Sequence, residues 1–386
     1  MTLRALRRLS DGRPVCGAMG SKTSGESHQS PPGRLSPFEP SATPASLGYR
    51  MPAEWSPHAG TWLSWPHKRD TWPGKFETVE PVMVQAVAAL APGEAVHINV
   101  LDSLHEQQVR ALLSGVSGPV HYHHFPTNDA WCRDHGAVFV TRAGAAPLAA
   151  VDFAFNAWGG KYPPYDLDDA IPRRMAEALD IPRFPAHMVL EGGSIDVNGA
   201  GTVLTTEQCL LNPNRNPHLD RRAIEERLRE FLGVSQVLWL GQGIAGDDTD
   251  GHVDDIARFV AEDTVVAVME DDPRDENHAS LADNLARLRS MRLADGRPLS
   301  VVELPMPAPV YHDGQRLPAS YANFYIGNAV VLLPVFNDPW DTTARRILEG
   351  CFPGRHVIAI DCTDLVWGLG AFHCLTQQLP RVSVPD

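Results

Sequence analysis

Residues 246–260 read GDDTDGHVDDIARFV, an acidic turn that follows an apolar run at 237–240. Five aspartates lie within the nine residues from Asp247 to Asp255, and His252 stands among them. So much negative charge in one turn is costly unless a cation balances it. The stretch therefore predicts a metal ion or an organic cation as its partner. It is not an EF-hand, because no glutamate follows the glycine in the register that a calcium loop requires.

Three further polar clusters occupy Gly-rich or Asp-rich turns, where functional residues concentrate. NDAWCRDHG (128–136) places Asp134 and Trp131 together, so that a carboxylate and an aromatic wall could hold a cation. The alternative interpretation of this cluster is an Asp–Arg ion pair beside a core tryptophan. EGGSID (191–196) sets Glu191 before two glycines as a candidate general acid or base, but a solvated glutamate is the simpler interpretation of that turn alone. GLGAFHCLTQQ (368–378) contains Cys374.

The six cysteines are scattered without a CxxC pair, which predicts reduced thiols in the cytoplasm, with no disulfide framework and no zinc finger. Cys374 has the best context for a reactive thiolate, and Cys132 is its serious rival. Cys209 and Cys351 lie in or beside apolar segments and are expected to be buried and inert. A thiol, a histidine, a glutamate and two aspartates without a metal pattern suit nucleophilic attack on a cationic carbon.

Apolar runs and amphipathic stretches alternate from residue 49 to the C-terminus, which predicts a mixed α/β fold in one catalytic domain, 49–386. Residues 1–48 are rich in Ser, Pro and Gly and are expected to be a disordered extension. The strands are expected at 96–101, 138–141, 237–240, 264–268, 329–333 and 357–360. The helices are expected at 78–90, 221–232, 277–293 and 341–348.

The charge balance narrows the class of partner. Lys and Arg number 33 and Asp and Glu 47, which gives a net charge of −14. Such a surface repels nucleic acid and anionic membranes and attracts small cations. No apolar stretch reaches the roughly 20 residues that span a bilayer.

Several long motifs together resemble one family. They are MPAEWSPHAGTWLSWP (51–66), NDAWCRDHGAVFV (128–140), FNAWGGKYPPYDLDD (155–169), LEGGSIDVNGAGTVLTTEQCLLNPNRNP (190–217), GDDTDGHVDDIARFV (246–260), SYANFYIGNAVVLLPVFNDPWDTTA (320–344) and GLGAFHCLTQQLP (368–380). In this order they resemble agmatine deiminase, of the guanidine-modifying (pentein) superfamily, related to bacterial peptidylarginine deiminase. The resemblance implies a five-bladed, pseudo-symmetric α/β propeller and hydrolysis of agmatine to N-carbamoylputrescine and ammonia, in putrescine and polyamine synthesis.

The resemblance also implies roles for particular residues. Cys374 matches the nucleophile, His252 and Glu191 the acid/base pair, and Asp134 and Asp254 the carboxylates that bind the guanidinium. Trp131 matches the residue that flanks the substrate's carbon chain. No metal or other cofactor is implied, and the family often forms dimers or larger homo-oligomers. The sequence departs from the family's pattern at Leu369, Ala371 and Phe372, where the loop before the cysteine is bulkier, and at Ala137, where a proline is usual.

Three alternatives stay open at this stage. A deiminase of free or peptidyl arginine would need a cation for the substrate's carboxylate, and Lys161 or Arg215 could supply it. A metal-dependent amidohydrolase could combine His252 and Asp254 with the histidines at 121, 123 and 124, although we favour polar residues entering a loop for that group. A non-catalytic guanidine-binding protein would keep the fold and release no ammonia.

Overall fold

A computed structural model describes residues 41–382 of the chain. Most of the expected disordered extension, 1–48, lies outside the described residues. Its last part is ordered: a 3-10 turn, η1 (Ala45–Leu47), packs against a helix of the body, and the Arg142 guanidinium donates to the Leu47 carbonyl at 3.0 Å. From Ala42 to the last described residue, 382, the chain groups as one compact unit. The ordered body therefore begins several residues before position 49.

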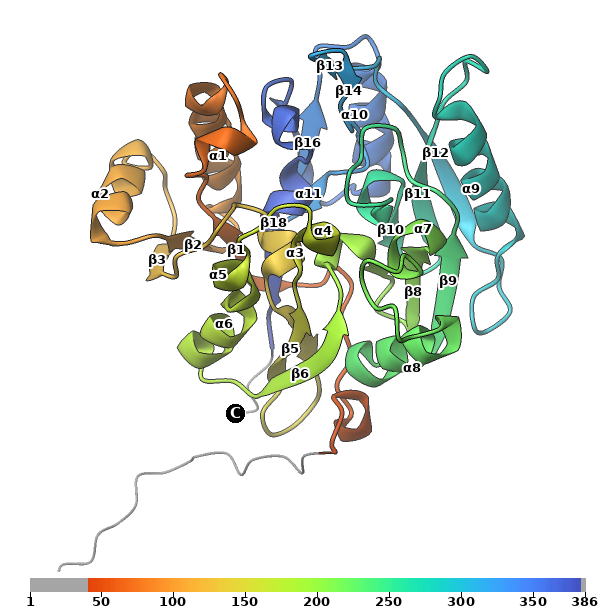
Figure 1. Cartoon of the computed structure of the whole chain (residues 1–386), viewed down its shortest axis with the longest axis horizontal. Helices are drawn as coiled ribbons and strands as arrows, with labels where there is room; N and C mark the ends of the chain where they lie inside the picture. Colours follow the sequence, from red (N-terminus) through yellow and green to blue (C-terminus); the bar gives the residue numbers. More distant parts are fainter. Residues whose placement is uncertain (1–40, 383–386) are drawn as a thin grey trace, which may run out of the picture. The chain divides into compact units, whose positions relative to one another are not determined.

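Five sheets share one local plan among the described residues (Figure 1). In each, an antiparallel pair is followed by a parallel pair. The sheets contain β18 (Thr376–Pro380) with β1 (His58–Ser64), β2 (Ala95–Val100) and β3 (Val120–His124); β4 (Val138–Thr141) with β5 (Leu148–Ala154) and β6 (Arg183–Val189); β7 (Asp196–Val197) with β8 (Thr202–Thr206) and β9 (Gln236–Leu240); β10 (Ala257–Ala261) with β11 (Thr264–Met269) and β12 (Ser300–Pro305); and β15 (Tyr325–Ile326) with β16 (Val330–Val335) and β17 (His356–Asp361). The mixed α/β prediction is confirmed, and none of the five sheets closes on itself.

A helix connects the parallel strands of each sheet, because parallel neighbours require a crossover. These helices are α1 (Phe76–Leu90), α6 (Ile171–Leu179), α8 (Arg221–Leu232), α9 (His278–Ser290) and α10 (Asp341–Cys351). Four of the five were expected from the periodicity of the sequence, with bounds within three residues of those observed. The expected strands likewise correspond to β2, β4, β9, β11, β16 and β17.

Helix α8 shows why the sequence predicted these elements well. The Asp220 carboxylate accepts a backbone N–H of the first turn at 2.8 Å, which caps the helix. Ile224 and Leu228 fall on one buried face, and Gly233 ends the helix at φ +67°, a conformation that glycine adopts without strain. Local signals alone therefore define both ends and the inward face.

One local prediction is wrong. The histidines at 121–124 form the edge strand β3 rather than the entry to a loop. The His123 ring joins an aromatic stack in which Trp62 lies 4.3 Å from His123 and 4.7 Å from His97 of β2, centroid to centroid. His124 is exposed, and its Nε2 lies 2.6 Å from Glu106 Oε2. A stacked imidazole such as that of His123 packs as an aromatic side chain does, so the polar composition of the segment misled the prediction.

The long helices lie around the outside of the body in Figure 1, and short turns lie near its middle. The short elements are α3 (Cys132–His135), α11 (Phe372–Leu375), η3 (Gly192–Ser194) and η4 (Val253–Asp255). α3 packs against α11 and η3, and η3 packs against η4. Each carries one of the four polar clusters, so the fold brings distant clusters together. In the described part of the chain, every helix is too short or too polar to cross a membrane.

Candidate active site

The glycine at position 193 marks the point where three of the four clusters meet. A Cβ atom built there would lie 2.6 Å from Nδ1 of His252, 2.9 Å from Oδ1 of Asp134 and 3.0 Å from Oδ2 of Asp254. Real Cβ atoms do not approach other heavy atoms so closely, so only glycine fits. Gly193, the second glycine after Glu191, therefore allows these three polar side chains to pack closely together.

Asp134 is almost fully buried and is held by two donors. The Gly193 N–H donates to Oδ1 at 3.0 Å, and the Trp158 indole donates to Oδ2 at 2.9 Å. Burial raises the pKa of Asp134 to about 6, and the neighbouring carboxylates of Asp254 and Glu191 act in the same direction. The site thus keeps a carboxylate that is poorly compensated without a cation.

His252 is fully buried beside two carboxylates. Its Nδ1 lies 3.8 Å from Asp134 Oδ1, and its Nε2 lies 4.0 Å from Glu191 Oε2. Neither ring nitrogen has a hydrogen-bond partner. Burial opposes the charged ring, but Asp134, Cys209 and Asp254 outweigh it and raise the pKa of His252 well above the usual value. The ring can therefore hold a proton at neutral pH.

Glu191 is fixed from behind by an arginine. Arg215 donates from Nε to Glu191 Oε1 at 2.6 Å, and both side chains are fully buried. Oε2 has no partner and faces the His252 ring. The carboxylate is held in place while one oxygen stays available to the imidazole.

Cys374 lies in the short helix α11 and is 5% exposed. The Asn323 amide donates to Sγ at 3.0 Å, and Asp254 Oδ2 is 3.6 Å from Sγ. Burial raises the pKa of Cys374 well above the usual value, and the carboxylates of Asp254, Asp255 and Asp134 add to the effect. The thiolate is disfavoured until positive charge arrives.

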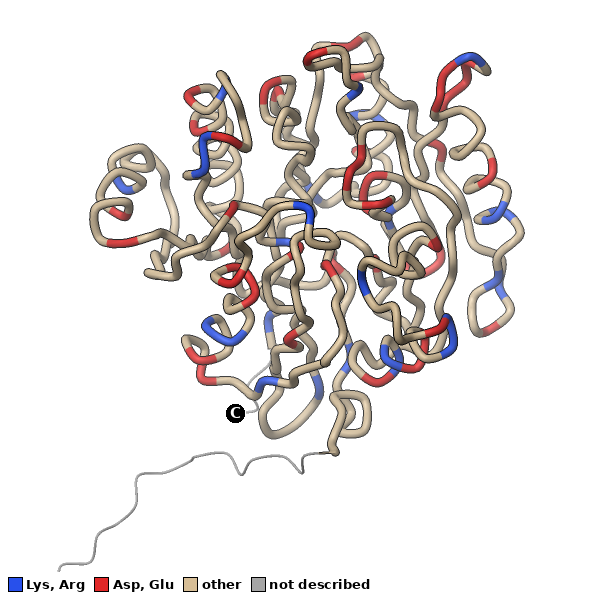
Figure 2. The backbone as a smooth tube through the Cα atoms, viewed as in Figure 1, with Lys and Arg blue, Asp and Glu red and all other residues tan. Residues whose placement is uncertain are grey.

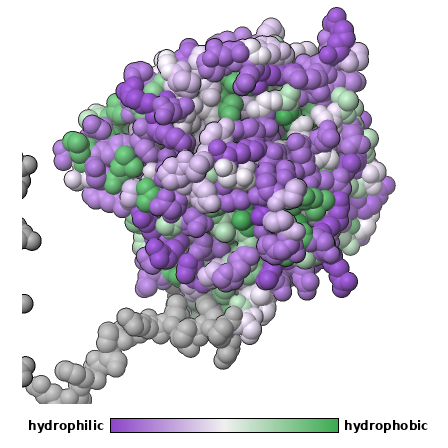
Figure 3. Space-filling view, viewed as in Figure 1, coloured by the Kyte–Doolittle hydropathy of each residue, from purple (hydrophilic) through white to green (hydrophobic). Residues whose placement is uncertain are grey.

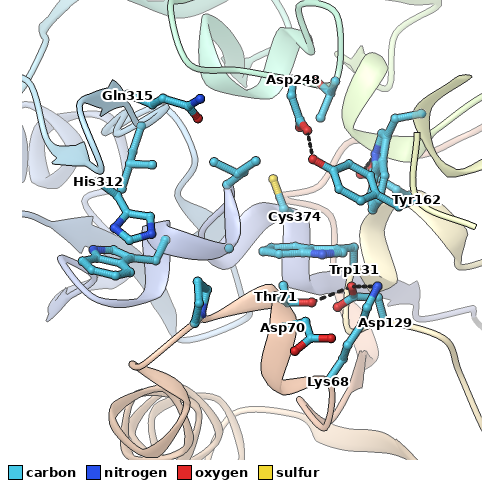
Figure 4. Close-up of a pocket in the computed structure, with 18 residues that line it drawn as sticks. Lys68, Asp70, Thr71, Asp129, Trp131, Tyr162, Asp248, His312, Gln315 and Cys374 are labelled. Carbon is cyan, nitrogen blue, oxygen red and sulfur yellow. Dashed lines mark hydrogen bonds and ion pairs between the residues drawn. The ribbon is translucent and has the colours of Figure 1, made fainter. Parts of the chain in front are cut away.

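A cavity of about 370 Å³ opens onto this sulfur (Figure 4). Trp131, Trp158 and Trp367 supply aromatic walls, and Cys374 and Asp134 lie among the lining residues. A Cβ at Gly370 would meet Trp131 at 2.6 Å and Cys374 Sγ at 3.2 Å, so that glycine lets the indole reach the sulfur. The predicted residues Trp131, Asp134 and Cys374 thus line one pocket.

The cavity rim is acidic. Its carboxylates belong to Asp70, Asp129 and Asp248, and Figure 2 shows acidic residues clustered on loops near the middle of the view. Lys68 is the one Lys or Arg among the lining residues, and its ammonium lies 3.3 Å from Asp129 Oδ2. The rim therefore presents more anionic than cationic groups to a ligand.

The two candidate cations for the carboxylate of an arginine substrate, Lys161 and Arg215, are already engaged with other groups of the protein. Arg215 donates to Glu191 and, from Nη1, to Asp250 Oδ2 at 2.5 Å. Lys161 Nζ lies 3.0 Å from Asp250 Oδ1 and also donates to the Asp248 carbonyl. Neither lines the cavity. The sequence-based suggestion that they receive a substrate carboxylate is therefore wrong.

Two other suggestions from the sequence are also wrong. Cys132 is fully buried in a separate apolar cluster, and burial raises its thiol pKa to about 12. It does not line the cavity and is no rival nucleophile. Of the histidines in β3, His123 stacks on Trp62 and on His97, whereas among the described residues the close ligand atoms near His252 belong to Glu191 and Cys209. The metal set of the amidohydrolase alternative is not assembled.

The sequence analysis assigned no role to Glu54 or His373. In the structure, His373 contacts both Glu54 and the site residue Asp254. Glu54 Oε2 accepts a hydrogen bond from Arg133 at 3.1 Å and lies 2.9 Å from His373 Nε2, and it forms an ion pair with Arg258 at 3.0 Å. The other nitrogen of His373 lies 2.6 Å from Asp254 Oδ2. Glu54 is a buried carboxylate near the start of the ordered body, and a charged residue within a largely apolar segment is a signal that could have drawn attention to it. Its partners could not have been found in the same way, because they are distant in the sequence.

The three residues before Cys374 that depart from the family's pattern lie in different environments. Phe372 and Ala371 are buried in the protein. Only Leu369 lines the cavity, and it adopts φ +70°, where a non-glycine residue is strained. The bulkier loop therefore changes the cavity wall at a single position.

Comparison with known proteins shows the family to which the chain belongs. Residues 50–380 match the model of the Porphyromonas-type peptidyl-arginine deiminase family. The chain belongs to this family. The agmatine deiminase of Ectopseudomonas mendocina is 38% identical over 361 residues, which cover 88% of this chain and 97% of that relative.

Solved structures of the family have the same fold. The agmatine deiminase of Enterococcus faecalis is similar with a TM-score of 0.81 and 34% identity, over 88% of this chain and 98% of the other. A putative arginine deiminase from Porphyromonas gingivalis is similar with a TM-score of 0.79 and 39% identity, over 86% and 98% of the two chains. One of these two proteins is named for agmatine and the other for arginine, so the family alone does not identify the substrate.

Proposed function

We propose that the chain is a hydrolase that converts agmatine and water to N-carbamoylputrescine and ammonia through a covalent intermediate on Cys374. The observation that carries this proposal is the meeting of His252, Asp134 and Asp254 around Gly193, beside a cavity that reaches the Cys374 sulfur. A planar cation is the ligand that several buried carboxylates and aromatic walls favour.

The guanidinium binds first, between the two aspartates. Asp134 offers both oxygens, each of which keeps an unused lone pair, and Asp254 offers the buried Oδ1, which has no partner. Trp131 packs along the methylene chain. The planar N–H groups match carboxylates in pairs, which orients the central carbon toward Cys374.

Binding of the cation then favours the thiolate. In the free site, burial and nearby carboxylates hold the pKa of the Cys374 thiol well above its usual value. The guanidinium neutralises the negative charge of Asp254 and Asp134 and adds a positive charge beside the sulfur. The thiol gives its proton to solvent water. Sγ then forms a bond to the guanidinium carbon while a C–N π bond becomes a nitrogen lone pair, which gives a neutral tetrahedral adduct.

His252 moves the protons. The ring starts protonated, because its neighbours raise its pKa well above the usual value. It gives a proton to the departing nitrogen, so ammonia leaves and an S-linked thiouronium remains. The neutral ring then takes a proton from water as hydroxide adds to the carbon. The C–S bond breaks and releases the Cys374 thiolate, and the hydroxyl proton passes to solvent, which leaves the neutral ureido product. Glu191, held by Arg215, keeps the ring in position.

The cavity favours agmatine over arginine. Agmatine ends in an ammonium group alone, which the carboxylates of Asp70 and Asp248 suit, whereas free arginine carries a carboxylate beside the same ammonium group. Of the cations near the rim, Lys68 is paired with Asp129, and Lys161 with Asp250. A substrate carboxylate would have to break one of these pairs.

We also propose that the five sheets are the blades of an α/β propeller around this site. The support is the order of antiparallel then parallel pairing that each sheet repeats. A net charge of −14 supports a small cationic partner over nucleic acid or a membrane surface. The free thiols among the described residues suit the cytoplasm, and a homo-oligomer is expected.

The test is release of ammonia and ureido product from agmatine, free arginine and a peptidyl arginine at equal concentration. We expect kcat/KM for agmatine to exceed the other two by at least about 100-fold, the value of a few kcal/mol of charge complementarity. Cys374→Ser should release no ammonia, and Cys132→Ser is the matched control. Agmatine binding without ammonia release would leave a non-catalytic binding protein, and preference for arginine would overturn the substrate.

A further inference from the structure

A second set of potential ligand atoms lies behind His252, on the side of the ring that faces away from Asp134. Glu191, Cys209 and His252 each offer one atom, and these atoms lie within 4.8 Å of one another. In the part of the chain that the structure describes, no other group of three such side chains is this compact. All three residues are fully buried.

The unused hydrogen-bonding capacity of this cluster points to a ligand. Glu191 Oε2 and His252 Nε2 face each other at 4.0 Å, and neither has a hydrogen-bond partner. Buried polar atoms without partners are rare and cost free energy, so an occupant that satisfied both would be stabilised. The gap is too long for a direct hydrogen bond.

The Cys209 sulfur is held beside the ring by the local structure. Thr206 caps the short helix α7 (Glu207–Leu210), and its hydroxyl oxygen accepts the Cys209 N–H at 3.2 Å. The same hydroxyl donates to the carbonyl of Gly251, the residue before His252, at 2.6 Å. One side chain therefore ties the cysteine and the histidine segments together.

We propose that Glu191, Cys209 and His252 form an inhibitory site for a thiophilic divalent cation such as Zn²⁺. One sulfur, one imidazole nitrogen and one carboxylate oxygen are ligands that zinc accepts, with bonds of about 2.0–2.3 Å and a water as the fourth ligand. The metal takes the Cys209 sulfur as thiolate, and the thiol proton goes to solvent. The donors have to close by about 1 Å to reach these bond lengths.

Inhibition follows from the proposed function, on which this inference rests. A metal on Nε2 of His252 prevents the ring from becoming the imidazolium that gives its proton to ammonia. The same metal also occupies the free oxygen of Glu191. The guanidinium of Arg215, which donates to the other oxygen of Glu191, opposes a cation here, so binding is weaker than at structural zinc sites.

Direct binding is tested with Co²⁺ in the Cys374→Ser protein, where the nucleophilic sulfur is gone. We expect the thiolate-to-cobalt charge-transfer absorption to rise with added Co²⁺, and to be lost when Cys209→Ala is added to that protein. Cys351→Ser in the same background is the control and should keep the band. Thermal melting of each variant checks folding, and Cys209→Ser replaces Cys209→Ala where the latter does not fold. A band that persists without the Cys209 sulfur, or no band in the Cys374→Ser protein, overturns the proposal.

The functional arm compares Zn²⁺ inhibition of ammonia release between the wild-type chain and Cys209→Ala. Each rate is divided by the rate of the same protein with chelator. We expect the inhibitory concentration to rise at least about tenfold in Cys209→Ala, which corresponds to about 1.4 kcal/mol. Equal inhibition of the two proteins would place the metal on Cys374 and refute the proposal. If the wild-type chain releases no ammonia, the proposed function fails, and the cobalt experiment still decides the metal site.

Discussion

Replacing Asp134 with asparagine should stabilise the protein while it abolishes activity. The free energy of unfolding reports the cost of the buried charge. Burial raises the pKa of Asp134 from 3.8 to about 6. At about 1.4 kcal/mol per pKa unit, ionising this carboxyl at pH 8 costs the folded state about 3 kcal/mol. An asparagine carries no charge and avoids that cost.

The gain is reduced by a lost hydrogen bond. Asp134 accepts from both Gly193 N–H and the Trp158 indole, and an amide has one oxygen for two donors. Leaving one donor unsatisfied costs about 1–2 kcal/mol. At pH 8 the net effect of Asp134→Asn is therefore a stabilisation of about 1–2 kcal/mol, together with loss of the anion that binds the guanidinium.

The pH dependence gives this prediction its sign. A carboxyl whose pKa is raised on folding binds its proton more tightly in the folded state. Wild-type stability relative to Asp134→Asn therefore increases as pH falls through about 6 toward 4, and the ionisation cost at pH 5 is about half that at pH 8.

Urea unfolding of both proteins at pH 8 and pH 5 measures the difference. Asp313→Asn, at a side chain that is 91% exposed, is the control and should show no such trend. If Asp134→Asn is less stable than wild type at pH 8, and the difference is the same at pH 5, the account of a buried, poorly compensated charge is refuted.

Three further outcomes are expected. Gly193→Ala should lower kcat/KM by at least about 100-fold, because the added Cβ would displace His252 and both aspartates. Gly350→Ala is the control and should keep the wild-type kcat/KM, because Gly350 in α10 has open space around it. Equal kcat/KM values for the two variants would contradict the packing argument. kcat/KM should fall about tenfold per pH unit below pH 6 as Asp134 takes up its proton, and a flat profile between pH 5 and 8 would be inconsistent with that titration. A haloacetamidine should label Cys374 and not the deeply buried Cys132, as peptide mass spectrometry of the labelled chain would show.

Local patterns in the sequence were sufficient for the secondary structure where a helix has a cap and one apolar face. Asp220 and Gly233 bracket α8, and the observed bounds match the expectation. The loop prediction for the histidines of β3 was wrong because this segment is held by pairing with β2 and by stacking of His123 on Trp62, which belongs to β1. Strand pairing is a long-range property, so composition alone could not reveal it.

The loop before Cys374 shows a similar division. The sequence showed three residues there, Leu369, Ala371 and Phe372, that make the loop bulkier than the family's usual pattern, and all three could have narrowed the cavity. Only Leu369 lines it, because α11 begins at Phe372 and directs that ring into the core. Which side of the backbone a residue faces depends on where the helix starts, and that is fixed by tertiary packing.

By itself, the amino-acid sequence determined the residue types of the site: one thiol, one imidazole and several carboxylates in turns that follow strands, with too few cations to neutralise them. The tertiary structure decided which of these groups meet. It brought His252, Asp134 and Asp254 around Gly193, excluded Cys132, occupied Arg215 with Glu191, and set Cys209 behind the imidazole. The physical reason is that charge and nucleophilicity depend on neighbours within a few ångströms, and those neighbours come from turns of different sheets that only the folded chain brings together.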